Sequence, residues 1–214
     1  MSAQLWKGVN VAMQSALATA LTITAITKAN PAVVSYTGTD PSNGDYVVLT
    51  VAGMVQLNGR VVRVANVNGA GNTFECEGVD SSAFDTFSSG TCAVITFGTT
   101  LATAVGLSAS GGDFDLIDIT TIHDTERKTT PGLPSALAFN FESLWDPSDT
   151  GLAALKSASD NQAERAFKFT WPSGYKYLFK GYVGASLVPT GNAQDKVTTP
   201  VQVTANGKGT AYSS

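Results

Sequence analysis

Residues 146–183 of this 214-residue chain, DPSDTGLAALKSASDNQAERAFKFTWPSGYKYLFKGYV, contain its clearest local structure signals. Asp146 can accept from free backbone N–H groups, Pro147 fits the first helical position, and Asp149 adds negative charge to the first turn. The polar residues 159–161 are typical of the C-terminal end of a helix. The spacing predicts a helix of about three turns. Two leucines would share one face of it: Leu152 and Leu155.

Two aromatic-rich strands follow this helix, joined by the turn at residues 172–174. Because successive side chains of a strand point to opposite faces, a three-residue turn places every ring on one face, whereas a two-residue turn would scatter them. The rings are Phe167, Phe169, Trp171, Tyr175, Tyr177 and Phe179. The other face carries Lys168, Lys176, Leu178 and Lys180. We therefore predict an aromatic core face and a lysine face that contacts solvent or another subunit.

The overall composition indicates a mainly β protein. Only 14% of residues are charged and 21 are glycine, as in domains of many short strands and turns. The net charge of −4 argues against a general binder of nucleic acid or of anionic membranes, which need a positive surface. Cys76 and Cys92 could form a disulfide or remain free thiols, and no metal-ligand spacing is present.

The uncharged residues 8–27 are too polar for a membrane span or a signal peptide, because Asn, Gln, Ser and Thr interrupt the apolar residues. The pairs Val9 with Val11 and Leu21 with Ile23 alternate with polar side chains instead. This alternation predicts two half-buried strands.

Residues 30–97 consist of short β runs separated by turns such as Asn-Gly. They contain six acids and two arginines, and so account for the whole net charge of the chain. The runs are 45–51, 60–67, 73–77 and 92–97. We expect an inserted β domain at residues 29–98, with a host domain formed by residues 1–28 and 99–214.

A long polar loop is expected at residues 123–134, between strands predicted at 114–122 and 136–145. A loop of about twelve residues without structure of its own is unusual in a compact domain and is often functional.

Short motifs occur in a fixed order over residues 113–207. They are Asp118-Ile119-Thr120-Thr121, Pro131-Gly132-Leu133, Asp146-Pro147-Ser148-Asp149, and then Phe169, Pro172, Gly174, Phe179, Gly181 and Val183. This ordered series resembles the major tail tube proteins of long-tailed bacteriophages. The resemblance implies a β-sandwich or half-barrel flanked by one helix. The insertion resembles small β domains that recur in phage structural proteins, with the turns Asn43-Gly44-Asp45, Asn58-Gly59 and Asn72-Thr73-Phe74.

The resemblance further implies a structural virion protein, made in the host bacterial cytoplasm, that needs no cofactor. Its copies would form hexameric rings that stack into the tail tube and conduct DNA without binding it. Its partners would be itself, the tape measure protein and the tail tip or terminator proteins, with no membrane. Because the channel must stay open, we predict that the inserted domain decorates the outer wall. The long loop would reach an adjacent subunit or ring through His123, Asp124, Glu126, Arg127, Lys128 and Pro131.

A neutral or acidic channel wall would let DNA slide, because lysine and arginine would hold its phosphates. We hypothesise that Asp113, Asp115 or Glu142 contributes to this wall. A metal site at Asp113, Asp115 and Asp118 is disfavoured, because the alternating acids, central glycine and distal glutamate of a Ca²⁺ loop are absent.

The same residues bear on three alternative functions. Catalysis is not expected, because His123 and Asp124 are mere sequence neighbours and no nucleophile motif accompanies them. The rings and lysines of residues 165–181 could form a platform for single-stranded nucleic acid, but strand alternation separates them onto opposite faces. An adhesion or carbohydrate-binding protein, in which the insertion binds the ligand, is the third reading.

Overall fold

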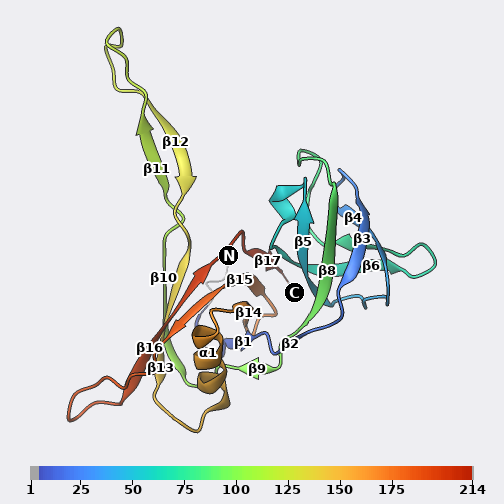
Figure 1. Ribbon diagram of the computed structural model, residues 1–214. Coiled ribbons are helices and arrows are strands. Elements are labelled where there is room, and N and C mark those ends of the chain that lie inside the picture. The colour runs from blue at the N-terminus through green and yellow to red at the C-terminus, as the bar shows by residue number, and fades with distance from the viewer. Residues whose placement is uncertain (1–4, 214) are drawn as a thin grey trace.

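The computed structural model describes residues 5–213, to which all structural statements below refer. The chain folds into two antiparallel sheets, a two-stranded hairpin that projects from the larger sheet, and one α-helix, α1 (Thr150–Asp160) (Figure 1). The prediction of a mainly β fold with one helix is confirmed. No helix of these residues is long and apolar enough to span a membrane.

The larger sheet has eight strands in the order β10-β13-β16-β15-β14-β1-β9, with β17 beside β15. Their bounds are β1 (Asn10–Met13), β9 (Thr99–Thr100), β10 (Ala104–Ser110), β13 (Ala138–Leu144), β14 (Glu164–Thr170), β15 (Lys176–Ala185), β16 (Thr198–Ala205) and β17 (Thr210–Tyr212). Since β10 and β9 end the path, each has one edge without a partner strand within the described chain.

The hairpin of β14 and β15 has the predicted register. Phe167 lies opposite Phe179 and Phe169 lies opposite Tyr177, and the Trp171 amide donates to the Tyr175 carbonyl over 2.9 Å. The turn needs glycine at residue 174, where φ is +91°. Leu152 and Leu155 of α1 belong to the same buried cluster as the phenylalanines. The predicted aromatic core is therefore confirmed at its centre.

The N-cap of the helix lies three residues later than predicted, at Asp149 instead of Asp146. The Asp149 side chain accepts from the Leu152 amide over 2.8 Å, so Asp149 is the N-cap. Asp146 instead accepts from the Ser148 amide over 2.9 Å, in a turn before the helix. A Cβ on Gly151 would lie 2.6 Å from the Thr100 carbonyl oxygen. The first helical turn thus packs directly on the β9 backbone, a contact that local sequence does not reveal.

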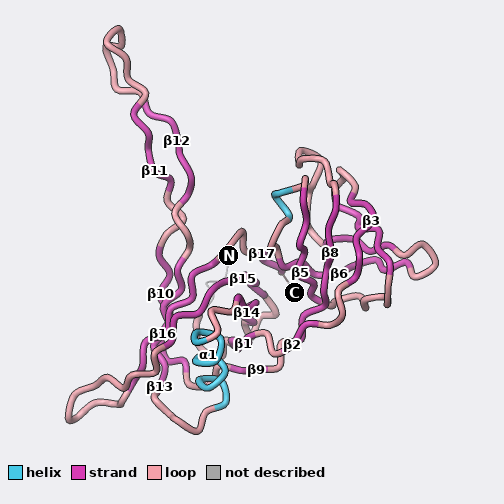
Figure 2. The backbone as a smooth tube through the Cα atoms, viewed as in Figure 1, coloured by secondary structure: helices cyan, strands magenta, loops and turns pink. Residues whose placement is uncertain are grey.

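The smaller sheet has seven strands and is closed, because β8 pairs with both β3 and β5 (Figure 2). Its elements are β2 (Ala16–Leu17), β3 (Leu21–Ile26), β4 (Ala32–Thr37), β5 (Tyr46–Ala52), the 3-10 turn η1 (Val55–Leu57), β6 (Val61–Asn68), β7 (Thr73–Cys76) and β8 (Ser89–Thr96). Cys76 and Cys92 are free thiols inside it, and burial raises the pKa of Cys76 to about 12.

Strand pairing moves the start of the smaller domain. The expected boundary at residue 29 left β3 in the host domain, but β3 pairs with β4 and β8. Its buried side chains fill the core of the closed sheet together with Tyr36 and Phe74. These side chains are Leu21, Ile23 and Ile26. We therefore propose a domain boundary near Ser15.

The two sheets meet at an apolar interface, here called the domain interface. The smaller sheet contributes Val48, Val61, Ala93 and Ile95, and the larger sheet contributes Ala166, Leu178 and Tyr212. The Arg63 amide donates to the Tyr212 hydroxyl over 2.6 Å. The Lys168 ammonium lies 5.3 Å from the centre of the Tyr46 ring and 4.8 Å from that of Phe97. Burial, and then the nearby charge of Lys176, lowers the pKa of Lys168.

The domain interface corrects the expectation for the lysine face of β14 and β15. That face was predicted to contact solvent or another subunit, but Ala166 and Leu178 are completely buried against the chain's own smaller domain. The predicted alternation of side chains between the two faces of the hairpin is confirmed. The covering layer comes from residues about a hundred positions away, which hairpin parity cannot indicate.

The arm is the projecting hairpin of residues 113–134, formed by β11 (Phe114–Asp118) and β12 (Thr129–Pro134) (Figure 1). The predicted polar loop over residues 123–134 is therefore wrong in its second half, where the chain is a strand. Pro131 and Pro134 obscured β12, since proline removes a backbone donor. They are tolerated here because β12 has only β11 as a neighbour and the register shifts between Phe114 and Leu116.

Candidate assembly surfaces

The arm exposes large apolar side chains along its length. Each of the following is more than half exposed: Phe114, Leu116, Ile117, Ile119, Ile122 and Leu133. A single exposed apolar residue is normal on a protein surface, but six within one projecting hairpin indicate an interaction site. The arm therefore has the properties of a contact surface.

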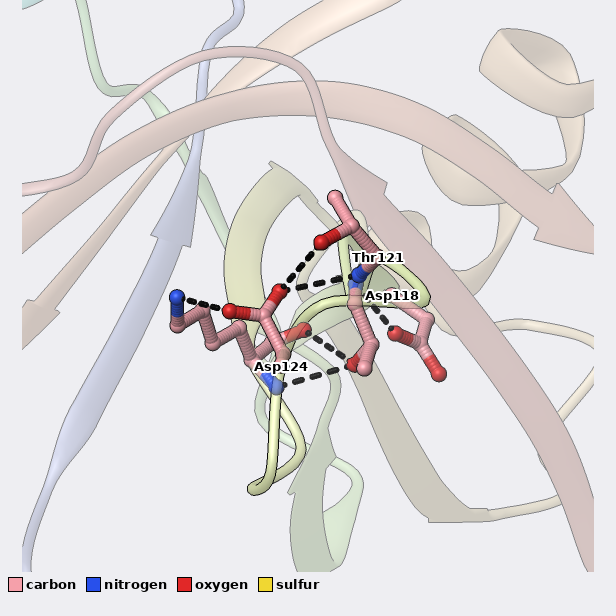
Figure 3. Close-up of polar contacts among 5 residues, drawn as sticks. Asp118, Thr121 and Asp124 are labelled. Atoms are coloured by element: carbon pink, nitrogen blue, oxygen red, sulfur yellow. Dashed lines mark hydrogen bonds and ion pairs between the residues drawn. The ribbon is translucent and has the colours of Figure 1, made fainter.

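The arm tip is an ordered turn held by two aspartates (Figure 3). Asp118 accepts from the Thr120 amide over 2.8 Å, and Asp124 accepts from the Thr121 amide over 2.9 Å. Lys128 forms an ion pair with Asp124. Arg127 donates to Asp118 over 3.1 Å.

The residues predicted to reach a neighbouring subunit are therefore divided by the structure. Asp124, Arg127 and Lys128 hold the tip together, Pro131 lies in β12, and His123 and Glu126 are exposed at the tip. Contact of these residues with another copy stays a prediction.

Substitution of Lys128 should change the pKa of Asp124 at the arm tip. Hydrogen bonding from Lys128, and then from Thr121, lowers the pKa of Asp124. The stabilisation that the Asp124 carboxylate contributes is thus fully present above the ordinary aspartate pKa and is lost as the pH falls through the lowered value. Lys128→Gln should move the Asp124 pKa up toward the ordinary value in an NMR titration of the side-chain carboxyl. Lys196→Gln, which is remote in sequence and structure, is the control. An unchanged pKa in Lys128→Gln would contradict the assignment.

The three acids proposed for a channel wall do not form one cluster. Asp113 and Asp115 lie on the arm, whereas Glu142 lies on β13, where it is opposite Gly106. All three are exposed, and a Glu142 oxygen lies 3.9 Å from the Lys196 nitrogen. Within residues 5–213, no group of three His, Cys, Asp or Glu side chains could hold a metal ion. The placement of these acids in a channel remains a prediction.

The unpaired edges of the larger sheet form a further surface. Residues 99–100 of β9 and 104–110 of β10 end the strand order, and a cavity of about 200 Å³ lies among residues 100–102, 104–107 and β1. An edge presents free backbone N–H and C=O groups that invite pairing with another strand.

An apolar groove of about 470 Å³, here called the aromatic groove, lies at the turn between β14 and β15. Its lining is Trp171, Tyr175, Lys176, Tyr177, Ala211, Tyr212 and Ser213. The prediction that all six rings are core is wrong at this end, since Tyr175 is 45% exposed. Helix α1 covers the other end of β15, where Ser159 accepts from the Ala185 amide over 3.1 Å. The central rings are buried and unavailable to stack on bases, so the nucleic-acid platform over the whole hairpin is excluded.

Comparison with known proteins identifies the family. A family model described as phage tail tube protein matches residues 52–214. No curated protein is similar enough in sequence to count as a match. Among solved structures, the chain is similar to one from the tail of an empty GTA particle, determined by helical refinement with C6 symmetry. The two share 12% sequence identity over 70% of this chain and 92% of that one, with a TM-score of 0.40. Because the family model spans well over half of its residues, the chain belongs to the phage tail tube protein family and is a structural component of the virion tail.

Proposed function

We propose that copies of this chain form hexameric rings that stack into the tail tube, the conduit for DNA ejection. Family membership supports the structural role. The observation that carries the assembly is the combination of two unpaired edges on the larger sheet with an apolar arm that projects from it.

The unpaired edges supply the contact around a ring. If an edge of one copy pairs with an edge of the next, six copies close into a circle and no free edge remains. The arm supplies the contact along the tube. Its distance from the rest of the chain lets it reach a neighbouring copy, and a head-to-tail contact that does not close can grow as a filament (Figure 1).

The channel should repel DNA rather than hold it. Exposed carboxylates on Asp113, Asp115 and Glu142 are suitable for such a wall, because only cationic walls gain free energy by releasing phosphate counterions. We propose that the smaller domain lies on the outer wall, which leaves the channel open. The tape measure protein would occupy the channel during assembly, and the tail tip and terminator proteins would contact the two ends.

Electron microscopy of the purified protein tests this proposal. We expect tubes or sixfold rings from the natural chain. The double variant Leu116→Asp with Leu133→Asp should lose the tubes, because it places charge on the arm where an apolar contact is needed. Val55→Asp, at a 63% exposed position of the smaller domain, is the control and should still form tubes. A persistent monomer, whether it binds glycans or binds DNA with strong salt dependence, would overturn the proposal.

A further inference from the structure

The arm carries a charge as well as an apolar surface. Residues 113–134 contain five acids (Asp113, Asp115, Asp118, Asp124 and Glu126) against two bases, Arg127 and Lys128, so their net charge is −3 with histidine neutral. The surface that receives the arm must therefore be apolar and must carry positive charge that is not already neutralised.

One lysine lines the aromatic groove, and two others are sequence neighbours of residues that contact its lining. Lys176 is in its lining, Lys208 precedes Gly209, and Lys7 follows Trp6. Two contacts place the latter two segments at the groove. A Cβ on Gly209 would lie 2.1 Å from the Tyr177 hydroxyl, and the rings of Trp6 and Trp171 are 5.4 Å apart.

These lysines differ from three others near the larger sheet, which have acidic partners. Lys156 pairs with Asp160, Lys180 with Glu164, and Lys196 approaches Glu142. In the described part of the chain, Lys7, Lys176 and Lys208 take part in no salt bridge, and residues 5–10, 171–177 and 206–213 contain no acid. The aromatic groove is thus both apolar and positively charged, which complements the arm.

We propose that the arm of one copy docks in the aromatic groove of a second copy of this chain. Phe114 and Leu116 share a face of β11 by strand alternation and would contact the rings, while arm carboxylates would approach Lys176 and Lys208. The receiving groove belongs to another copy, because the arm points away from the body of its own chain (Figure 1). The inference rests on the proposed self-assembly and names the surface that receives the arm.

Cross-linking between two labelled populations tests the contact. One population carries Leu116→Cys and a size tag, and the other carries Tyr175→Cys without a tag. After co-assembly and treatment with a short bismaleimide, we expect a product of the mixed mass. The natural Cys76 and Cys92 are buried in the smaller domain and should not react in the folded protein. Val55→Cys replaces Tyr175→Cys in the control mixture. Equal yield with Val55→Cys, or no mixed product in assemblies that microscopy shows to be tubes, would overturn the docking.

Reversing charges on the groove and on the arm, and measuring the protein concentration needed for tube growth, provides an independent test of the docking. The variant Lys176→Glu with Lys208→Glu should raise the protein concentration needed for tube growth by about ten-fold, since like charges would face each other across the interface. Adding Glu126→Lys, which reverses the exposed arm carboxylate that is not assigned to the channel wall, should restore part of the growth. Lys28→Glu with Lys196→Glu makes the same change of charge elsewhere and should have little effect. If the natural chain forms no rings or tubes, the proposed function itself fails. If the groove variant grows tubes normally, only the docking site is wrong.

Discussion

Replacing Phe169 with alanine should lower the free energy of unfolding by about 3–5 kcal/mol. This ring is 1% exposed and is the hub of the core of the larger sheet. Its centre lies 5.5–6.3 Å from those of six other rings, which are Trp6, Phe139, Phe141, Trp171, Tyr177 and Phe179. Because these rings come from several strands and from the N-terminal segment, they cannot all move inward, and a cavity would remain.

Phe114→Ala is the matched control, because it removes the same atoms from a position that is 60% exposed. Its effect on the unfolding of the monomer should lie within about 0.5 kcal/mol. Urea denaturation followed by circular dichroism, at concentrations too low for assembly, measures both. Equal losses for the two variants would show that the ring cluster does not provide the core stability assigned to it.

Replacing Leu178 with aspartate should separate the two domains. Leu178 is completely buried in the domain interface with Ala166 and Tyr212. A carboxylate there would have to remain desolvated among apolar side chains, at a cost of about 3 kcal/mol or more. Undocking of the smaller domain exposes the carboxylate to water and avoids that cost. We therefore expect both a lower unfolding midpoint and a larger radius of gyration in small-angle X-ray scattering.

Leu133→Asp is the control for this experiment, since Leu133 is 86% exposed on the arm and its monomer should keep the natural stability and dimensions. Where Leu178→Asp unfolds altogether, Tyr212→Phe supplies a milder test. It removes only the hydroxyl that accepts from the Arg63 amide over 2.6 Å. Increased cleavage by protease between the domains, relative to the natural chain, is then the expected result. Unchanged dimensions and protease resistance in both variants would contradict the role of the domain interface.

Elements governed by alternation between neighbouring residues were predictable from the sequence. The register of β14 and β15 is the clearest case, because only one turn length places the rings on one face, and the pairing of Phe167 with Phe179 confirms it. The length of α1 and its buried leucines are equally local properties. The order of motifs after Asp113 also indicated the family, which the match over residues 52–214 confirms.

Features that depend on distant segments were not predictable. Leu178 looks like one more residue of an outward face until the smaller domain covers it. The core strand β3 carries the same alternation whether it joins the larger or the smaller sheet. The first turn of α1, which follows the N-cap Asp149, packs through Gly151 on β9, a strand about fifty residues earlier.

The stretch of residues 146–183 shows where this division falls. By itself, the sequence of residues 146–183 determined the helix, the hairpin, its register and the faces on which rings and lysines lie, because strand alternation and turn length are set by adjacent residues. Only the tertiary structure decided which parts of those faces remain exposed. It buried Phe167 and Leu178 and left Tyr175 and Lys176 at an open groove, because burial depends on which distant chain segment packs against each position.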